Sequence, residues 1–228
     1  MKIAIHQPQY LPWLGYFDKM DQSDVFVLLD DVQYKKNEWQ NRNKIRNSEG
    51  WQWITVPVLY EFGQEIREVN IDTAGNWREK HIKSIELNYS KAPYFDKYFT
   101  FFLDIFEREW QSLSDLNTHF IEYFKETLGI KAKLIRSSNL NVQTSSTERL
   151  VDICKLLEAD VYLSGAGGEE YLDVELFKQS GIGLEFQAYK HPRYEQVYEG
   201  FEPYMAVADL LFCQGDKSIE IIREGRKK

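Results

Sequence analysis

Two short apolar runs that flank an amphipathic stretch constrain the fold more than any other feature of this sequence. Residues 2–5 (KIAI) and 25–29 (VFVLL) have the continuous apolar character of strands that are buried on both faces. Residues 13–20 (WLGYFDKM) place their large apolar side chains at helical spacing. Strand, helix and strand within the first 29 residues predict a βαβ unit, and hence a parallel sheet with a right-handed crossover.

The rest of the chain also alternates between strand and helix patterns. Two strands, at 51–58 and 66–71, are predicted to form a small β-hairpin that turns near Phe62-Gly63. Further strands are predicted at 133–136, 161–163 and 184–189, and helices at 77–86, 94–109, 116–128, 146–157, 205–212 and 217–223. We therefore predict the α/β class, as one domain over residues 1–228 with a parallel Rossmann-like sheet, a mostly helical insertion at about 76–129 and the small β-hairpin.

Composition and charge narrow the class of protein. Phe, Trp and Tyr make up 15% of the 228 residues, which excludes intrinsic disorder. The net charge of −8 argues against a protein that coats nucleic acid nonspecifically. The two cysteines, Cys154 and Cys213, cannot form a disulfide framework or a zinc site. With no run of 18 apolar residues and no apolar signal region at its start, we expect a soluble cytoplasmic protein without a membrane span.

Three polar or glycine-rich segments follow predicted strands. Residues 6–12 follow the first strand, Asp30-Asp31 follow the second, and residues 164–168 follow the strand at 161–163. Ligands of parallel α/β sheets bind outside the carboxyl ends of the strands. The topology therefore predicts that the three segments converge on one edge of the sheet.

The first two segments hold the catalytic candidates. His6 is the candidate acid or base, in a loop that also carries the binding candidates Gln7 and Tyr10. The alternative is a histidine that hydrogen-bonds to carbonyl groups in the core. Asp30 is the second catalytic candidate, and Asp31 is a candidate ligand for sugar hydroxyls or a metal. For both carboxylates, a structural salt bridge is the competing interpretation.

A cationic island, residues 35–46 (KKNEWQNRNKIR), contrasts with the acidic remainder of the chain. It holds five basic residues and one acidic residue, which leaves −12 on the rest of the protein. Such an island favours a small anionic ligand such as phosphate or pyrophosphate. A solvated loop and an RNA-binding patch are the alternatives. The candidate ligand-binding residues are Trp39, Asn41, Arg42, Lys44 and Arg46.

The turn at 164–168 (SGAGG) is glycine-rich and stands between a predicted strand and a helix. Such turns can offer backbone N–H groups to an anion, and the candidate residues are Ser164, Gly165, Gly167 and Gly168. A plain tight turn is the alternative, because neither a Walker A loop nor a full GxGxxG is present. We find no metal-ligand spacing and no nucleophile elbow, so no metal ligand is predicted.

The remaining histidines and cysteines give weaker signals. By pattern, His81, His119 and His191 fall on helix or loop surfaces, and only His81 is kept open as a site candidate. Cys154 lies on an apolar helix stripe and is expected in the core. Cys213 lies near a helix end, where we expect more exposure.

Several segments, in order along the chain, resemble the WbqC-like family. They are HQPQYLPWLGYFDK (6–19), SDVFVLLDD (23–31), VQY (32–34) leading into WQNRNKIR (39–46), WITVPV (53–58), YLSGAGGEEYLD (162–173) and FEPYMAVADLLFCQG (201–215). The resemblance implies a role beside bacterial O-antigen and other surface-polysaccharide genes, often in amino-sugar decoration. In the family the glycine-rich turn commonly reads YLSG-PSG before a basic residue and Asp. Here Ala166-Gly167 replace Pro-Ser and Glu169 stands at the basic position, which weighs against a phosphate role for this turn.

The first 29 residues are also similar in layout to HIGH-type nucleotidylyltransferases and pantothenate synthetase. Both have a strand, a polar loop with His and Gly, a short helix and a second strand. The second His of their motif is absent, because residues 13–15 (WLG) occupy that region. This similarity would imply ATP and Mg, with a carboxylic acid activated as an adenylate.

The leading hypothesis is an enzyme that modifies a nucleotide-linked amino sugar by acyl or aminoacyl transfer. In it, His6 is the acid or base, Arg42, Lys44 and Arg46 hold phosphates, and Trp39 or Tyr10 stacks on a base or sugar. The alternative is a non-catalytic scaffold of a polysaccharide assembly complex, with the aromatic helix at 94–109 as its partner face. RNA binding through residues 35–46 is a third reading, against which the acidic remainder argues. The oligomeric state is left open.

Overall fold

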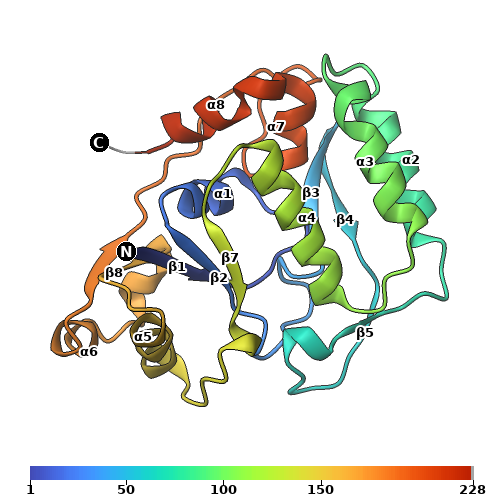
Figure 1. The fold of residues 1–228 in the computed structure, drawn as a ribbon. Coiled ribbons are helices and arrows are strands. Elements are labelled where there is room, and N and C mark those ends of the chain that lie inside the picture. Colours follow the sequence, from blue (N-terminus) through green and yellow to red (C-terminus); the bar gives the residue numbers. More distant parts are fainter. Residues whose placement is uncertain (227–228) are drawn as a thin grey trace.

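A five-stranded sheet organises the computed structural model, which describes residues 1–226 (Figure 1). All neighbouring strands pair in parallel, in the order β7-β2-β1-β8-β9. The strands are β1 (Lys2–His6), β2 (Val25–Leu28), β7 (Lys133–Arg136), β8 (Val161–Ser164) and β9 (Gly183–Phe186). The predicted α/β class with a parallel sheet is therefore confirmed.

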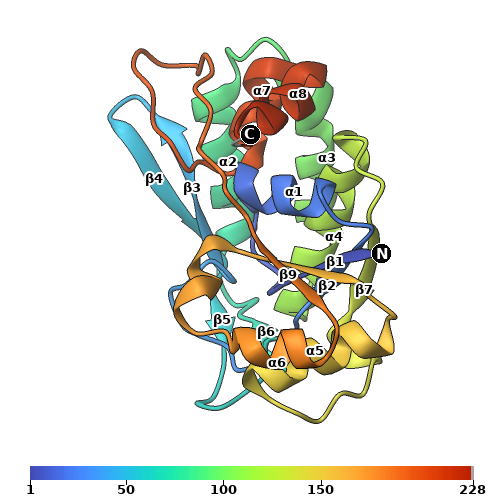
Figure 2. The ribbon, with the colours of Figure 1, turned by 90° about the vertical axis from the view of Figure 1, so that its left-hand side faces the viewer.

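The order of the strands places a topological switch point beside β1. The chain adds β2 and then β7 on one side of β1, and afterwards β8 and β9 on the other side. Helix α1 (Leu14–Asp21) connects β1 to β2, and α5 (Ser146–Leu156) precedes β8. Figure 2 shows α1 on one face of the sheet and α5 with α6 (Val174–Gln179) on the other. Crevices at such switch points are where open α/β sheets bind ligands.

Both faces of the sheet are buried, which explains why its strands are apolar throughout. Ala4 and Phe26 belong to the larger hydrophobic cluster, on the face of α1. Ile3 and Ile5 belong to a second cluster with α5 and α6, which also contains the buried Cys154. A strand covered on two sides cannot alternate apolar and polar residues, and this is the pattern that predicted β1 and β2.

The predicted helical segment between the hairpins and β7 forms three helices that pack with the C-terminal ones. They are α2 (Trp77–Tyr89), α3 (Phe95–Glu107) and α4 (Leu113–Thr127), followed near the C-terminus by α7 (Val207–Gln214) and α8 (Ser218–Glu224). Phe102 of α3 stacks against Phe120, Phe124 and Phe212 with ring centroids 5.5–6.3 Å apart. The aromatic face of α3 is thus interior surface, not the exposed partner face that the scaffold hypothesis requires. Helix α6 is the helix expected after the glycine-rich turn, although its bounds were not predicted.

The predicted pairing of residues 51–58 with 66–71 is wrong over most of its length. Strand β4 (Gly50–Thr55) pairs instead with β3 (Arg42–Asn47), and only the short strands β5 (Val58–Leu59) and β6 (Asn70–Ile71) pair as expected. Residues 66–68 form a 3-10 helix, η1 (Ile66–Glu68), whose start is fixed by reciprocal bonds between Glu65 and Glu68. Strand β3 was overlooked because its outward-facing side chains are the charges of the cationic island.

Three further 3-10 helices complete the structure: η2 (Ser137–Asn139), η3 (Ala166–Glu170) and η4 (Gly215–Lys217). Of these, η2 follows β7 and η3 follows β8, so both lie at the carboxyl edge of the sheet. Among residues 1–226, no helix combines the length and the apolar character that crossing a bilayer requires.

Candidate functional site

A cavity of about 620 Å³ opens at the switch point, between the carboxyl ends of β1 and β8 and the first turn of α5. We call it the switch-point pocket. Its volume lies within the range of small-molecule sites. Six of the residues predicted from strand ends line it: His6, Gln7, Ser164, Gly165, Gly167 and Gly168. The segments after β1 and β8 therefore meet, as the topology predicts.

Of the three glycines in the turn after β8, only Gly168 is packed too closely for a larger residue. A Cβ atom added to Gly168 would lie 2.1 Å from the Ser164 hydroxyl oxygen. Glu169 and Glu170 are exposed and do not line the pocket. An anion bound in the pocket would therefore not be in contact with either carboxylate.

Sequence reasoning missed four polar residues of the pocket. Ser146, Thr147 and Arg149 come from the first turn of α5, and Lys19 comes from α1. The α5 residues could have been found, because a helix that crosses back from a parallel strand begins at the carboxyl edge of the sheet. No sequence signal marks Lys19, whose neighbours in α1 are all buried.

Lys19 is a buried basic residue that lines the pocket. Its side chain is only 3% exposed, and Nζ donates a hydrogen bond to the Ile5 carbonyl at 2.8 Å. Burial lowers the pKa of Lys19 to about 7. Arg149 supplies a second cation, and it forms an ion pair with Asp31. Of the described residues that line the pocket, none is an Asp or Glu, so an anion bound there would contact basic side chains and no carboxylate.

His6 is held in this pocket with spare hydrogen-bonding capacity. Its ring lies 4.8 Å from the Tyr16 ring, centroid to centroid, and the Gln9 amide nitrogen lies 3.4 Å from Nε2. Among residues 1–226, Nδ1 has no hydrogen-bond partner. Burial, together with the charge of Lys19, holds the pKa of His6 well below its usual 6.5. His6 is consequently neutral at pH 7.

The two aspartates after β2 stand beside the switch-point pocket and do not line it. Asp30 is fully buried and accepts hydrogen bonds from the backbone N–H and the hydroxyl of Ser138, at 3.1 and 3.0 Å. Asp31 binds the Ser137 hydroxyl and Arg149. These bonds tie the end of β2 to η2 and α5, which matches the salt-bridge interpretation. Both carboxylate oxygens of Asp30 thus accept hydrogen bonds from η2.

The comparisons place this architecture in a family. The sequence model of the WbqC-like protein family matches residues 7–221. The chain belongs to this family. It is 37% identical, over 99% of both chains, to a protein of Mycobacterium tuberculosis described as uncharacterized protein Rv1507c. No solved structure matches the chain.

In this WbqC-like chain Arg42, Lys44 and Arg46 of the cationic island do not line the switch-point pocket. Arg42 stacks over the Trp53 ring at 4.2 Å and Lys44 over the Trp51 ring at 4.0 Å, on the outer face of the β3–β4 hairpin. Arg46 is buried and donates to the Glu199 carbonyl at 2.6 Å. Three of the five basic residues of the island therefore have partners within the protein itself.

Three further binding candidates have structural contacts in the WbqC-like chain. Asn41 is buried, and its amide donates to the Val56 carbonyl at 3.0 Å. Tyr10 is fully buried, with its hydroxyl 2.9 Å from His81 Nδ1. A ring so enclosed presents no face on which a base or sugar could stack. Trp39 is half-buried, and its ring centroid lies 5.6 Å from that of Trp53.

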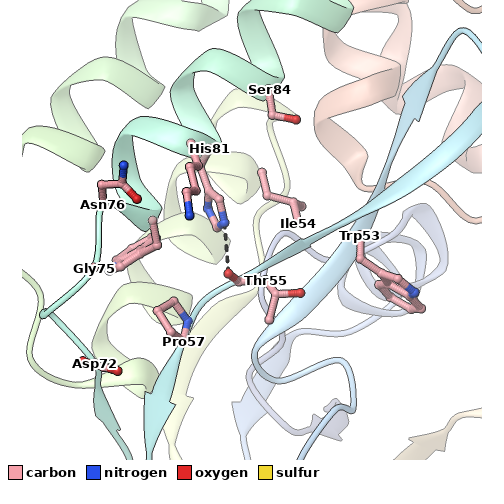
Figure 3. Close-up of a pocket in the computed structure, with 11 residues that line it drawn as sticks. Trp53, Ile54, Thr55, Pro57, Asp72, Gly75, Asn76, His81 and Ser84 are labelled. Carbon is pink, nitrogen blue, oxygen red and sulfur yellow. Dashed lines mark hydrogen bonds between the residues drawn. The ribbon is translucent and has the colours of Figure 1, made fainter.

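A second cavity, of about 430 Å³, lies between β4 and α2, and we call it the hairpin pocket (Figure 3). His81 lines it, but the expected surface position is wrong because this ring is 5% exposed. Nε2 donates to the Thr55 carbonyl at 3.1 Å, so Nδ1 accepts from the Tyr10 hydroxyl. Burial lowers the pKa of His81 to about 3.

The expected exposure of Cys213 is also wrong, because Cys213 is 6% exposed.

Proposed function

We propose that the protein is an enzyme of bacterial surface-polysaccharide biosynthesis that binds a nucleotide-linked amino sugar in the switch-point pocket and forms an amide on the sugar by acyl or aminoacyl transfer. The supporting observation is a cavity at the topological switch point that is lined by two cations and, among the described residues, by no carboxylate. The amino sugar rests on the family resemblance and is the part that experiment must decide.

The phosphates of the nucleotide would lie against the first turn of α5. Backbone N–H groups of that turn have no partner within the helix, and they attract negative charge together with the helix dipole. Arg149 and Lys19 add two cations to the same cavity. This assignment replaces the one expected from the sequence, in which the cationic island held the phosphates.

His6 is the residue that can move a proton. Because it is neutral at pH 7, one of its ring nitrogens carries a lone pair that can accept the proton of the attacking amine. The amine nitrogen forms a bond to the acyl carbon of a thioester or acyl adenylate, and the bond to the leaving group breaks with its electron pair. The proton then passes from His6 to the leaving group, so the imidazole is regenerated.

ATP and Mg remain part of the adenylate version of this proposal. The pocket suits a triphosphate by charge, but its described lining offers no carboxylate ligand, so Mg would be bound through phosphate oxygens and water. No group of three or more His, Cys, Asp or Glu that could hold a metal ion occurs within residues 1–226.

A thermal-shift panel tests the proposal. The ligands are ATP with Mg, nucleoside diphosphates and their glucosamine conjugates, and the proteins are the wild type, Lys19→Met and the matched control Arg42→Ala. A ligand at 100 times its Kd stabilises a protein by about 2.7 kcal/mol. We expect a glucosamine conjugate to shift the wild type and Arg42→Ala, and to lose its effect in Lys19→Met. The opposite pattern would move the site to the hairpin, and no shift at saturating concentrations would contradict the proposal.

A further inference from the structure

A third, smaller cavity adjoins the switch-point pocket. It measures about 190 Å³ and is lined by Gln7, Gln9, Lys35, Glu38, Trp39 and Gln40. We call it the glutamine pocket. Three side-chain amides and one indole ring line it, and its single cation and single carboxylate are both exposed. This lining contrasts with that of the switch-point pocket, whose charged side chains are both basic.

The amides of the glutamine pocket are ordered, and one keeps an unused acceptor. Gln40 donates to the Gln7 amide oxygen at 2.7 Å and accepts from the Lys35 backbone N–H at 3.3 Å. Gln9 is 8% exposed, and among residues 1–226 its amide oxygen has no hydrogen-bond partner. A buried amide oxygen without a partner costs free energy in the empty protein. A ligand hydroxyl or amine would recover that cost.

The two pockets meet at one shared residue, close to the histidine at which chemistry is proposed. Gln7 lines both cavities. Gln9 lines the glutamine pocket, and its amide nitrogen lies 3.4 Å from Nε2 of His6, which lines the switch-point pocket. One molecule could therefore extend from one cavity into the other and pass His6.

We infer that the glutamine pocket binds the sugar ring of the nucleotide-linked substrate, with its amine directed to His6. The face of the Trp39 indole supplies the apolar platform for a pyranose, and the amides of Gln7, Gln9 and Gln40 bind its hydroxyls. Uncharged amides suit a polyol better than they suit an ionic ligand, since each both donates and accepts. The inference rests on the proposed function, because that function places the nucleotide in the switch-point pocket.

Saturation-transfer NMR with free glucosamine tests the subsite by itself. The proteins are the wild type, Trp39→Ala, Gln9→Leu and the control Trp51→Ala, which removes an exposed tryptophan that lines neither pocket. Saturation transfer to the sugar ring protons is expected for the wild type and Trp51→Ala, and its loss is expected for both pocket variants. Gln9→Leu guards against a Trp39→Ala protein that fails to fold. Absence of transfer to the wild type at saturating sugar would overturn the inference.

Calorimetry separates this inference from the proposed function. The probes are the nucleoside diphosphate that gives the largest thermal shift and its glucosamine conjugate. The free diphosphate should bind the wild type and Trp39→Ala with equal Kd. The conjugate should bind the wild type at least about tenfold more tightly than the diphosphate does, and Trp39→Ala should abolish that gain. A gain that survives in Trp39→Ala refutes the subsite alone, whereas a diphosphate that binds no variant refutes the proposed function.

Discussion

The switch-point pocket and the hairpin pocket each contain a buried histidine, yet the two imidazoles are in opposite situations. In the hairpin pocket, His81 uses both ring nitrogens, one toward the Thr55 carbonyl and one toward the Tyr10 hydroxyl. In the switch-point pocket, Nδ1 of His6 has no partner among the residues described. The lining charges differ as well, because the hairpin pocket is lined by both an acidic residue, Asp72, and a basic one, Lys80. Unspent hydrogen-bonding capacity and a described lining without carboxylates, rather than the mere presence of a histidine in a cavity, mark the candidate site.

Replacing His6 by Asn should have the largest effect. If His6 transfers the proton, the rate of amide formation should fall by about 10²–10⁴-fold, with little change in the free energy of unfolding. The rate is measured by mass spectrometry of the amide product. The control is His119→Asn at the half-exposed surface of α4. An unchanged rate in His6→Asn would remove the contrast between the two histidines.

Replacing His81 by Leu should affect stability rather than chemistry. The variant leaves the buried Tyr10 hydroxyl and the Thr55 carbonyl without their partner, and an unpaired buried polar group costs about 1–3 kcal/mol. Urea denaturation measures the loss. In a Tyr10→Phe background the loss should be smaller, because the hydroxyl is no longer present. Equal losses in both backgrounds would show that the Tyr10–His81 bond contributes nothing to stability.

The pH dependence of ligand affinity should single out the switch-point pocket. Lys19 has a folded-state pKa of about 7, and a bound anion favours its protonated form. Affinity for a nucleoside diphosphate should therefore fall as pH rises through 7, by at most about tenfold per unit. Calorimetry between pH 6 and pH 9 checks this. In Lys19→Met this decrease in affinity with pH should be absent. A decrease that persists in the variant would show that other groups cause it.

Lys19 should also make the free energy of unfolding depend on pH. The unfolded chain keeps the Lys19 proton up to its ordinary pKa of 10.5, whereas the folded protein releases it near 7. Between these values the unfolded state binds more protons, so the Lys19 contribution to the free energy of unfolding rises with pH, by at most about 1.4 kcal/mol per unit. Urea denaturation at pH 7, 8 and 9 should show this rise in the wild type and a flatter profile in Lys19→Met.

Replacing Arg42 by Ala should have the smallest effect. It removes one half-exposed cation–π contact with Trp53, which stabilises by about 0.5–1 kcal/mol. Ligand affinity at the switch-point pocket should stay unchanged, since Arg42 does not line it. A large loss of nucleotide affinity would instead support the phosphate site that the sequence alone suggested for the cationic island.

Local sequence patterns predicted the central strands of the sheet. The features that they failed to predict depend on contacts between residues far apart in the sequence. Strands β1 and β2 were found because burial on both faces leaves a continuous apolar run. His6 and the glycine-rich turn were found because strand ends are adjacent in the sequence to the loops they position. Lys19 and Arg149 reach the same cavity from helices, and their roles depend on packing that no local pattern reports. The cationic island misled because Arg42 and Lys44 pack over tryptophan rings of the β3–β4 hairpin and Arg46 is buried against backbone carbonyls.

The position of β1 also sets the order in which the molecule can be assembled. This central strand lies near the start of the chain, and one of its edges pairs with β8, where Lys2 stands opposite Val161. During synthesis at ~5–20 residues per second, that edge waits roughly 7–30 s for its partner after β2 has emerged. Until then its backbone N–H and C=O groups are an open template for other strands. The cavity that we assign to catalysis therefore cannot form until late in translation, and a nascent chain arrested before β8 would be prone to aggregation.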